Sequence, residues 1–208
     1  DPGDLAYLQR SDDPYLNAVQ TWRNTYGADA VVLIVHYSPA PYCGVAYQLA
    51  GGIEPYFAAY AFAVVELDCA TGNLSLGHEL GHNMGANHDW YVNPGVDRFT
   101  YSHGYFSSTD RWRTIMSYND VCAAVGVSCT RLPYWSNPYV TYGGKPMDIP
   151  GGTSTSCPAY SPEPGCDADN HRALNETALT VANFRASVSG PPVAPSGLAV
   201  AAVSASQI

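Results

Sequence analysis

The stretch at residues 78–89 holds the side chains best suited to metal chemistry in this chain. It reads H-E-L-G-H-N-M-G-A-N-H-D. His78 and His82 are four residues apart, so in a helix their imidazoles project from one face, about one turn apart. Each can then reach a single Zn²⁺ at roughly 2.0–2.1 Å. Gly85 tolerates the left-handed conformation of a helix end, and the turn that follows would return His88 as a third ligand.

Glu79 lies beside the first of these histidines, where it can reach a water molecule without ligating the metal. Three protein ligands leave a fourth position open, as in catalytic rather than structural zinc sites. Zinc lowers the pKa of its bound water, and a carboxylate can take that water's proton and deliver it to a leaving amine. A metal-free, histidine-rich surface helix is the alternative, and a zinc site without catalysis would normally lack the glutamate. The pattern therefore predicts hydrolysis without a covalent intermediate.

This spacing resembles the metzincin clan of zinc endopeptidases, and a second motif supports the resemblance. Residues 113–118 read R-T-I-M-S-Y and resemble the clan's methionine turn, in which Met116 would form an apolar floor under the histidines. Asp89, directly after the third histidine, is similar to the adamalysin (reprolysin, ADAM-like) branch. Tyr118 departs from that branch and resembles the astacins and serralysins. Two roles stay open for it: a mobile donor to the oxyanion, or a buried aromatic whose hydroxyl is satisfied.

The resemblance also implies where a peptide substrate would bind. Gly44, Val45 and Ala46 resemble the edge strand with which an extended peptide pairs. Residues 131–138 (R-L-P-Y-W-S-N-P) resemble the wall of the S1′ pocket, and their apolar members imply a hydrophobic or aromatic P1′ residue; these are Leu132, Tyr134 and Trp135. Residues 169–185 resemble the closing helix of bacterial secreted adamalysin-like proteases.

The elements that must position these groups are predicted from periodicity and helix breakers. A helix is expected at residues 14–26, stopped by Gly27, and a buried central strand at the β-branched run 30–35. An edge strand is expected at 44–49, another strand at 60–67, and the zinc helix from a cap at Asn73 to about residue 84. The fold class is α/β (α+β), of metzincin-like zincin type: a mixed twisted sheet with an active-site helix and an irregular, disulfide-stapled C-terminal subdomain.

The chain divides into three segments by composition. Residues 1–188 are expected to form the catalytic domain, 189–196 (S-G-P-P-V-A-P-S) a linker, and 197–208 the truncated start of a fibronectin type III-like module. The family domain begins with a strand, a helix and a further strand before the matching segment. We therefore expect either a fragment without these N-terminal elements or a departure from the fold at this end.

Six cysteines and a low content of charged residues indicate a secreted protein. Spacing leaves several connectivities open; we expect sequential pairs, each stapling a loop near the proposed site, namely Cys43–Cys69, Cys122–Cys129 and Cys157–Cys166. Disulfides imply an oxidising compartment. The net charge of −9, with only nine Lys plus Arg, disfavours nucleic-acid and anionic-membrane partners, and no apolar run predicts a membrane span. Structural calcium would suit this acidity, but no calcium-loop motif locates it.

These observations together predict a secreted, monomeric zinc metalloendopeptidase that acts on extended peptides. The alternative from another class is a non-catalytic extracellular adhesion or matrix-binding module that retains a metzincin shell. The histidines outside the motif have no partner spacing for zinc and are expected to be structural; they are His36, His103 and His171.

Overall fold

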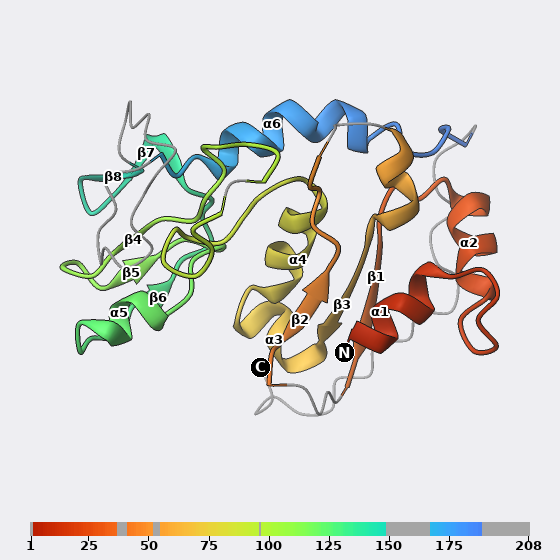
Figure 1. The fold of residues 1–208 in the computed structure, drawn as a ribbon, viewed down its shortest axis with the longest axis horizontal. Helices are drawn as coiled ribbons and strands as arrows, with labels where there is room; N and C mark the ends of the chain where they lie inside the picture. Colours follow the sequence, from red (N-terminus) through yellow and green to blue (C-terminus); the bar gives the residue numbers. More distant parts are fainter. Residues whose placement is uncertain (1, 37–40, 52–54, 96, 149–166, 189–208) are drawn as a thin grey trace, which may run out of the picture.

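The computed structural model describes residues 2–36, 41–51, 55–95, 97–148 and 167–188 (Figure 1). The helices are α1 (Pro2–Gln9), α2 (Ala18–Tyr26), α3 (Leu67–Gly72), α4 (Ser75–Asn83), α5 (Asp120–Ala124) and α6 (Asn170–Val181), with a 3₁₀ helix at Pro55–Tyr60. The strands are β1 (Val31–Val35), β2 (Gly44–Ala46), β3 (Phe62–Glu66), β4 (Phe106–Ser107), β5 (Trp112–Arg113), β6 (Thr130–Arg131), β7 (Asn137–Tyr142) and β8 (Lys145–Met147).

Helix α4 lies between two parts of the molecule (Figure 1). On one side is the sheet β1-β3-β2 with α1 and α2; on the other are the short strands β4 to β8 with α5. Helix α6 runs along the top of both parts. This arrangement confirms the predicted mixed α/β fold with a loop-rich second half.

Strand β3 is the centre of the main sheet. It pairs in parallel with β1 and antiparallel with β2. Its Phe62 and Val64 pack against Leu5 and Leu8 of α1. Alternation sends the intervening side chains to the opposite face, where α4 packs against the strand. Burial on both faces explains why every apolar residue of β3 is at most 2% exposed.

The run at 30–35 was expected to be the central strand, and this is wrong. It forms β1, which pairs only with β3 among the described residues. One face of β1 packs toward α1, while Ile34 on the other face is 48% exposed. A continuous β-branched run indicates that a segment forms a strand, but it does not indicate how many other strands that strand pairs with. The 44–49 segment is an edge strand as predicted, but it is shorter, at Gly44–Ala46.

The ends of two helices also differ from the prediction. The helix expected at 14–26 begins only at Ala18, because the Asp13 carboxylate accepts the backbone N–H groups of Tyr15 and Leu16 and holds a turn there. It ends at Gly27, which is left-handed as predicted (φ 62°). Asn73 does not cap α4; it follows α3, and its side-chain amide contacts the sulfurs of the Cys43–Cys69 pair. Helices α1 and α3 were not predicted.

Two of the three expected disulfides lie within the described residues. Cys43–Cys69 joins the start of β2 to α3, and Cys122–Cys129 joins α5 to the segment before β6. The second bond is buried in a small core with Phe106 and Val121. Cys157 and Cys166 lie outside the described residues, as do the segments 189–196 and 197–208.

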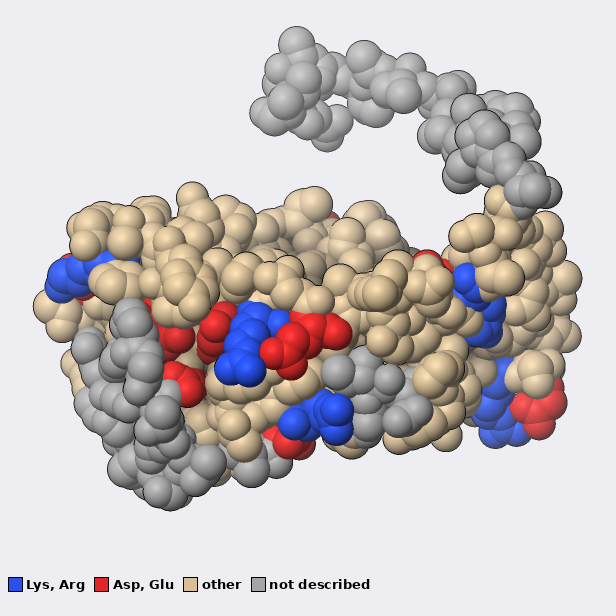
Figure 2. Space-filling view, turned by 90° about the horizontal axis from the view of Figure 1, so that it is seen from above, with Lys and Arg blue, Asp and Glu red and all other residues tan. Residues whose placement is uncertain are grey.

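The face over α6 carries mixed charge. Figure 2 shows basic groups beside acidic ones on this side of the molecule, and Arg172 pairs with Glu176 one turn along α6 at 2.8 Å. Such pairing, together with the net charge of −9, leaves little positive potential for a polyanion. No helix in the described part of the chain has the length and apolar character needed to cross a membrane.

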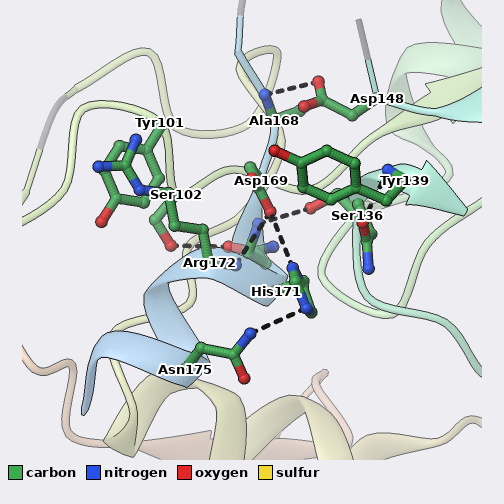
Figure 3. Close-up of polar contacts among 12 residues, drawn as sticks. Tyr101, Ser102, Ser136, Tyr139, Asp148, Ala168, Asp169, His171, Arg172 and Asn175 are labelled. Atoms are coloured by element: carbon green, nitrogen blue, oxygen red, sulfur yellow. Dashed lines mark hydrogen bonds and ion pairs between the residues drawn. The ribbon is translucent and has the colours of Figure 1, made fainter. Parts of the chain in front are cut away.

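The N-terminus of α6 holds the loop that follows α4 (Figure 3). The Asp169 carboxylate caps the helix by accepting the Arg172 N–H at 2.9 Å. The fully buried Asn170 side chain accepts from Asn87 N at 3.1 Å and from Ser102 Oγ at 2.8 Å, and it donates to Asn87 O at 3.2 Å. Because Asn87 precedes His88, α6 helps to position that histidine.

Candidate metal centre and active-site cleft

Three imidazoles converge at the C-terminal half of α4. His78 and His82 project from one face of the helix, and Gly85, at φ 87°, turns the chain so that His88 approaches them. The Nε2 atom of His88 lies 3.0 Å from Nε2 of both His78 and His82. Tetrahedral zinc ligands at 2.0–2.1 Å would be separated by about 3.3 Å. The three nitrogens therefore fit one metal ion.

The outer nitrogens of the first two histidines face hydrogen-bond acceptors. His78 Nδ1 lies 3.0 Å from the Ile115 carbonyl oxygen, and His82 Nδ1 lies 3.0 Å from the Ala86 carbonyl oxygen. Protons held on both Nδ1 atoms leave lone pairs on both Nε2 atoms, which point at His88. One proton on His88 cannot satisfy both lone pairs, so this donor set is suited to a cation.

Burial keeps the three imidazoles in the neutral form that binds metals. It lowers the pKa of His82 to about 4 and that of His88 to about 3, with the neighbouring His82 adding to the effect on His88. The pKa of His78 is also well below its ordinary value, first because of burial and then because of the other two histidines.

The methionine-turn segment lies against this centre. Met116 is fully buried and packs with Ala86 and Ile115, the two residues whose carbonyls face the histidines. A Cβ atom on Gly81 would lie 3.2 Å from Met116 Sδ and 2.7 Å from the Trp135 ring. The absence of a side chain at Gly81 therefore allows Met116 and Trp135 to pack closely against α4.

Asp89 has no exposed surface and accepts four hydrogen bonds. Its Oδ2 accepts from Tyr118 N at 2.8 Å and Ser117 Oγ at 3.0 Å, and its Oδ1 accepts from Tyr91 N at 3.0 Å and Val92 N at 3.2 Å. Burial raises the pKa of this carboxyl, and the four donors oppose the rise. Asp89 therefore has a structural role: its carboxylate joins the segment after His88 to the turn after Met116.

Glu79 and Tyr118 stand beside the imidazoles. Burial raises the pKa of the Glu79 carboxyl to about 8, while the Arg131 guanidinium acts in the opposite direction. A Cβ atom on Gly44 would lie 2.7 Å from Glu79 Oε1, so the edge strand approaches the carboxylate as closely as a glycine allows. The Tyr118 ring centroid is 4.6 Å from that of His88.

A cavity of about 280 Å³ opens beside Glu79. Among the described residues it is lined by Pro41, Tyr42, Cys43, Gly44, Asn73, Ser75, His78, Glu79, Arg113, Tyr118, Asn119, Asp120 and Arg131. It therefore brings together an open strand edge, one histidine of the metal centre, a buried carboxylate and a phenol.

Comparison with known proteins agrees with this site. The model of metallo-peptidase family M12 (reprolysin type) matches residues 5–136.

The chain belongs to metallo-peptidase family M12. A peptidyl-Asp metalloendopeptidase of Stenotrophomonas maltophilia strain R551-3 is 40% identical over 185 residues, which cover 88% of this chain and 38% of that protein. One from Xanthomonas campestris is 42% identical over 182 residues, covering 88% and 37%. The chain thus spans less than two fifths of the length of these relatives.

The fold is similar to part of a solved structure described as a chaperone-substrate complex. The TM-score is 0.55 at 18% identity, and the match covers 89% of this chain and 25% of the other. This likeness concerns the fold alone.

The three side chains predicted to form the S1′ wall of this M12 chain lie in three different surroundings. Leu132 is buried with Trp112 and Met147, and Trp135 packs against the cluster around Met116. Tyr134 is 42% exposed and lies near Tyr142. None of the three belongs to the lining of the cavity beside Glu79; Arg131, from the same segment, does.

Sequence reasoning did not single out Arg131, although an arginine is conspicuous in a chain with nine Lys plus Arg. His103 was expected to be structural, and its surroundings fit such a role. It is fully buried, its Nδ1 lies 2.8 Å from the His88 carbonyl oxygen, and its ring stacks on Trp90. It helps to fix the backbone of the third histidine.

Proposed function

We propose that this chain is the catalytic part of a zinc-dependent endopeptidase. The observation that carries the proposal is the convergence of three neutral imidazoles next to the buried carboxylate of Glu79, with Nε2 of His88 3.0 Å from Nε2 of both His78 and His82. His78, His82 and His88 would hold the ion. When bound, zinc would polarise the scissile carbonyl and make an attacking water more acidic. The non-catalytic adhesion alternative gives no reason for retaining Glu79 at this position.

Glu79 acts as the general base and then as the general acid. It takes a proton from water as the water attacks the carbonyl carbon, and it delivers this proton to the amide nitrogen that leaves. Its raised pKa suits both tasks near neutral pH. Tyr118 donates a hydrogen bond from its hydroxyl to the carbonyl oxygen as negative charge develops there. Among the described residues its hydroxyl has no hydrogen-bond partner, and the ring lines the cavity, which favours this role over that of a satisfied buried aromatic.

The substrate lies extended beside β2. Gly44, Val45 and Ala46 pair with β3 on one side only among the described residues. Their free backbone groups can therefore add a further strand. Such pairing would bring the scissile bond to Glu79, because Gly44 lies directly against that carboxylate.

We further propose that the cleaved bond lies next to an aspartate of the substrate. Two relatives at 40–42% identity are peptidyl-Asp metalloendopeptidases. The cavity lining holds Arg113 and Arg131 beside the carboxylates of Glu79 and Asp120, and the two arginines support an acidic rather than an apolar substrate side chain. This replaces the hydrophobic preference expected from the apolar wall residues.

Secretion, domain layout and oligomeric state complete the proposal. The disulfides Cys43–Cys69 and Cys122–Cys129 suit an oxidising compartment. We propose a catalytic domain over 1–188, a linker over 189–196, a fibronectin type III-like start at 197–208, and a monomer. Structural calcium stays part of the proposal without an assigned site.

The function is tested by zinc-dependent proteolysis. The purified chain should contain one zinc per molecule, measured by mass spectrometry of the metal, and should cleave unfolded casein. A chelator should abolish cleavage and added Zn²⁺ should restore it. A zinc-loaded, folded chain that cleaves neither casein nor Asp-containing peptides would refute the proposal.

A further inference from the structure

We propose that Arg131 is the specificity residue of this site and that it binds the acidic side chain of the substrate residue following the scissile bond. The inference rests on the proposed endopeptidase function and assigns its preference to one named group.

Arg131 and Arg113 occupy paired positions on neighbouring strands. Strands β5 and β6 are parallel, and Arg113 is in register with Arg131 while Trp112 is in register with Thr130. Because side chains alternate along a strand, the two arginines share one face of this small sheet, and both line the cavity beside Glu79. Leu132, the next residue, is turned to the other side and packs with Trp112.

If the proposed substrate pairs antiparallel with β2, the cavity lies on the carboxyl side of the scissile bond. Besides Glu79 it is lined by residues 41–44, which lead into and begin β2. A substrate antiparallel to β2 runs in the opposite direction, so the part that follows the scissile bond lies along these residues. The side chain directly after the cleaved bond is therefore the one that reaches Arg131.

Arg131 has unused hydrogen-bond donors. Nη1 donates to the Asn73 carbonyl at 2.7 Å, but the buried Nε has no partner among the described residues. Nη2 lies 2.9 Å from His78 Nδ1. That nitrogen cannot both accept from Arg131 and donate to Ile115 O, and metal binding through Nε2 requires the second arrangement. Once the metal is bound, Nη2–H also lacks an acceptor.

Arg131 forms no ion pair within the described residues, although the Glu79 carboxylate is near enough to interact with it. No carboxylate lies within 4.0 Å of its guanidinium in the part of the chain described here, and Arg113 beside it adds positive charge. A cation that is largely removed from solvent, like the half-buried Arg131, is stabilised by an anionic partner. A substrate carboxylate supplies both the charge and the missing acceptors.

Arg113 has a different task. Its Nε donates to Cys129 O at 3.2 Å and its Nη1 to Ser117 O at 2.6 Å, so it ties the turn after Met116 to the Cys122–Cys129 loop. It contributes positive potential to the cavity, while two of its donors are already used. The selective contact is therefore assigned to Arg131.

The test compares peptides that differ only in the residue after the scissile bond: Asp, its neutral isostere Asn, and Leu. Zinc-loaded wild type should cleave the Asp peptide with a kcat/KM at least about 30-fold above that of the Asn peptide, as expected for a buried charge pair. Arg131→Gln should lower cleavage of the Asp peptide by about this factor and leave the Asn peptide within about threefold of wild type. Arg131→Lys should retain part of the preference. Arg172→Gln, an exposed arginine on α6, is the matched control and should keep the wild-type ratio.

A second readout does not depend on turnover. Binding of the Asp and Asn peptides to zinc-loaded Glu79→Gln is compared with binding to Glu79→Gln/Arg131→Gln, after circular dichroism has verified folding. Preference for Asp should be present in the first protein and absent in the second. The proposal is overturned if Arg131→Gln keeps the wild-type Asp-to-Asn ratio, or if it weakens both peptides equally, as a purely structural role or an effect through Glu79 would. Absence of cleavage by wild type counts against the proposed function, while the binding comparison still decides the role of Arg131.

Discussion

The Asp89 carboxylate accepts the backbone N–H of Tyr118 at 2.8 Å, although 29 positions separate the two residues. Asp89 directly follows the third histidine, and Tyr118 comes two residues after Met116. One buried hydrogen bond thus joins the loop that carries His88 to the turn that carries Tyr118. The same carboxylate oxygen also accepts from Ser117 Oγ. The position of the metal centre relative to the tyrosine therefore depends on this side chain.

Replacing Asp89 by Asn should destabilise the fold. Asn offers one acceptor oxygen where the carboxylate offers two, and its NH₂ group would face N–H or O–H donors on one side. Leaving these buried donors unsatisfied should lower the free energy of unfolding by about 2–4 kcal/mol, measured by urea denaturation of the zinc-loaded protein. The exposed Asp12→Asn substitution serves as the control. Equal stability of the Asp89 variant and wild type would contradict the structural role.

Gly44→Ala should impair catalysis more than stability. The added Cβ would lie 2.7 Å from Glu79 Oε1, so either the carboxylate or the edge strand must move. A displacement of this size at a general base should reduce kcat/KM by about 100-fold. The control is Gly72→Ala, because a Cβ at that position meets nothing within 4 Å. Unchanged kcat/KM in Gly44→Ala would show that the strand does not approach the base as described.

Tyr118→Phe separates the two roles considered for this residue. If the hydroxyl stabilises developing charge on the substrate, its loss should lower kcat by about 100-fold while KM and zinc content stay near wild type. Steady-state kinetics with metal analysis measure this. A stability loss accompanied by an unaltered kcat would instead identify Tyr118 as a packed aromatic.

Asn170→Ala should weaken zinc binding, because Asn170 holds the backbone of Asn87 next to the third ligand, His88. It removes two hydrogen bonds to the Asn87 backbone and one to Ser102. The zinc dissociation constant should rise by about 10-fold, in the range found for groups that orient metal ligands. Competition with a fluorescent zinc chelator measures this constant. The exposed α6 variant Asn175→Ala should bind zinc like wild type.

The metal centre was predictable from spacing because it depends on local geometry. Residues four apart on a helix, a glycine at its end and a third histidine define the cluster almost without tertiary information. The side chains that line the cavity beside Glu79 were not predictable in this way. Resemblance located the wall segment, but a shift of one residue along a strand reverses which side chains face the cavity. Leu132 therefore joins the core, and Arg131 lines the cavity beside Glu79.

The order of the strands in the main sheet was also not predictable from local sequence. The runs that became β1 and β3 are both rich in β-branched or apolar residues, and only packing of α1 and α4 on opposite faces of β3 makes that strand central. The anchoring of Asn87 by Asn170 spans 83 positions and leaves no mark in local sequence patterns. Contacts of this kind follow from the assembled fold.

Zinc content and peptidase activity, measured side by side in Glu79→Gln and wild type, decide whether this centre hydrolyses peptides as described. Glu79 is expected to be a base and not a ligand, so the variant should bind one zinc with wild-type affinity and lose at least about 1,000-fold in kcat on an Asp-containing peptide. Cleavage by the zinc-loaded variant at the wild-type rate would contradict the assignment of Glu79, and with it the mechanism built on this site.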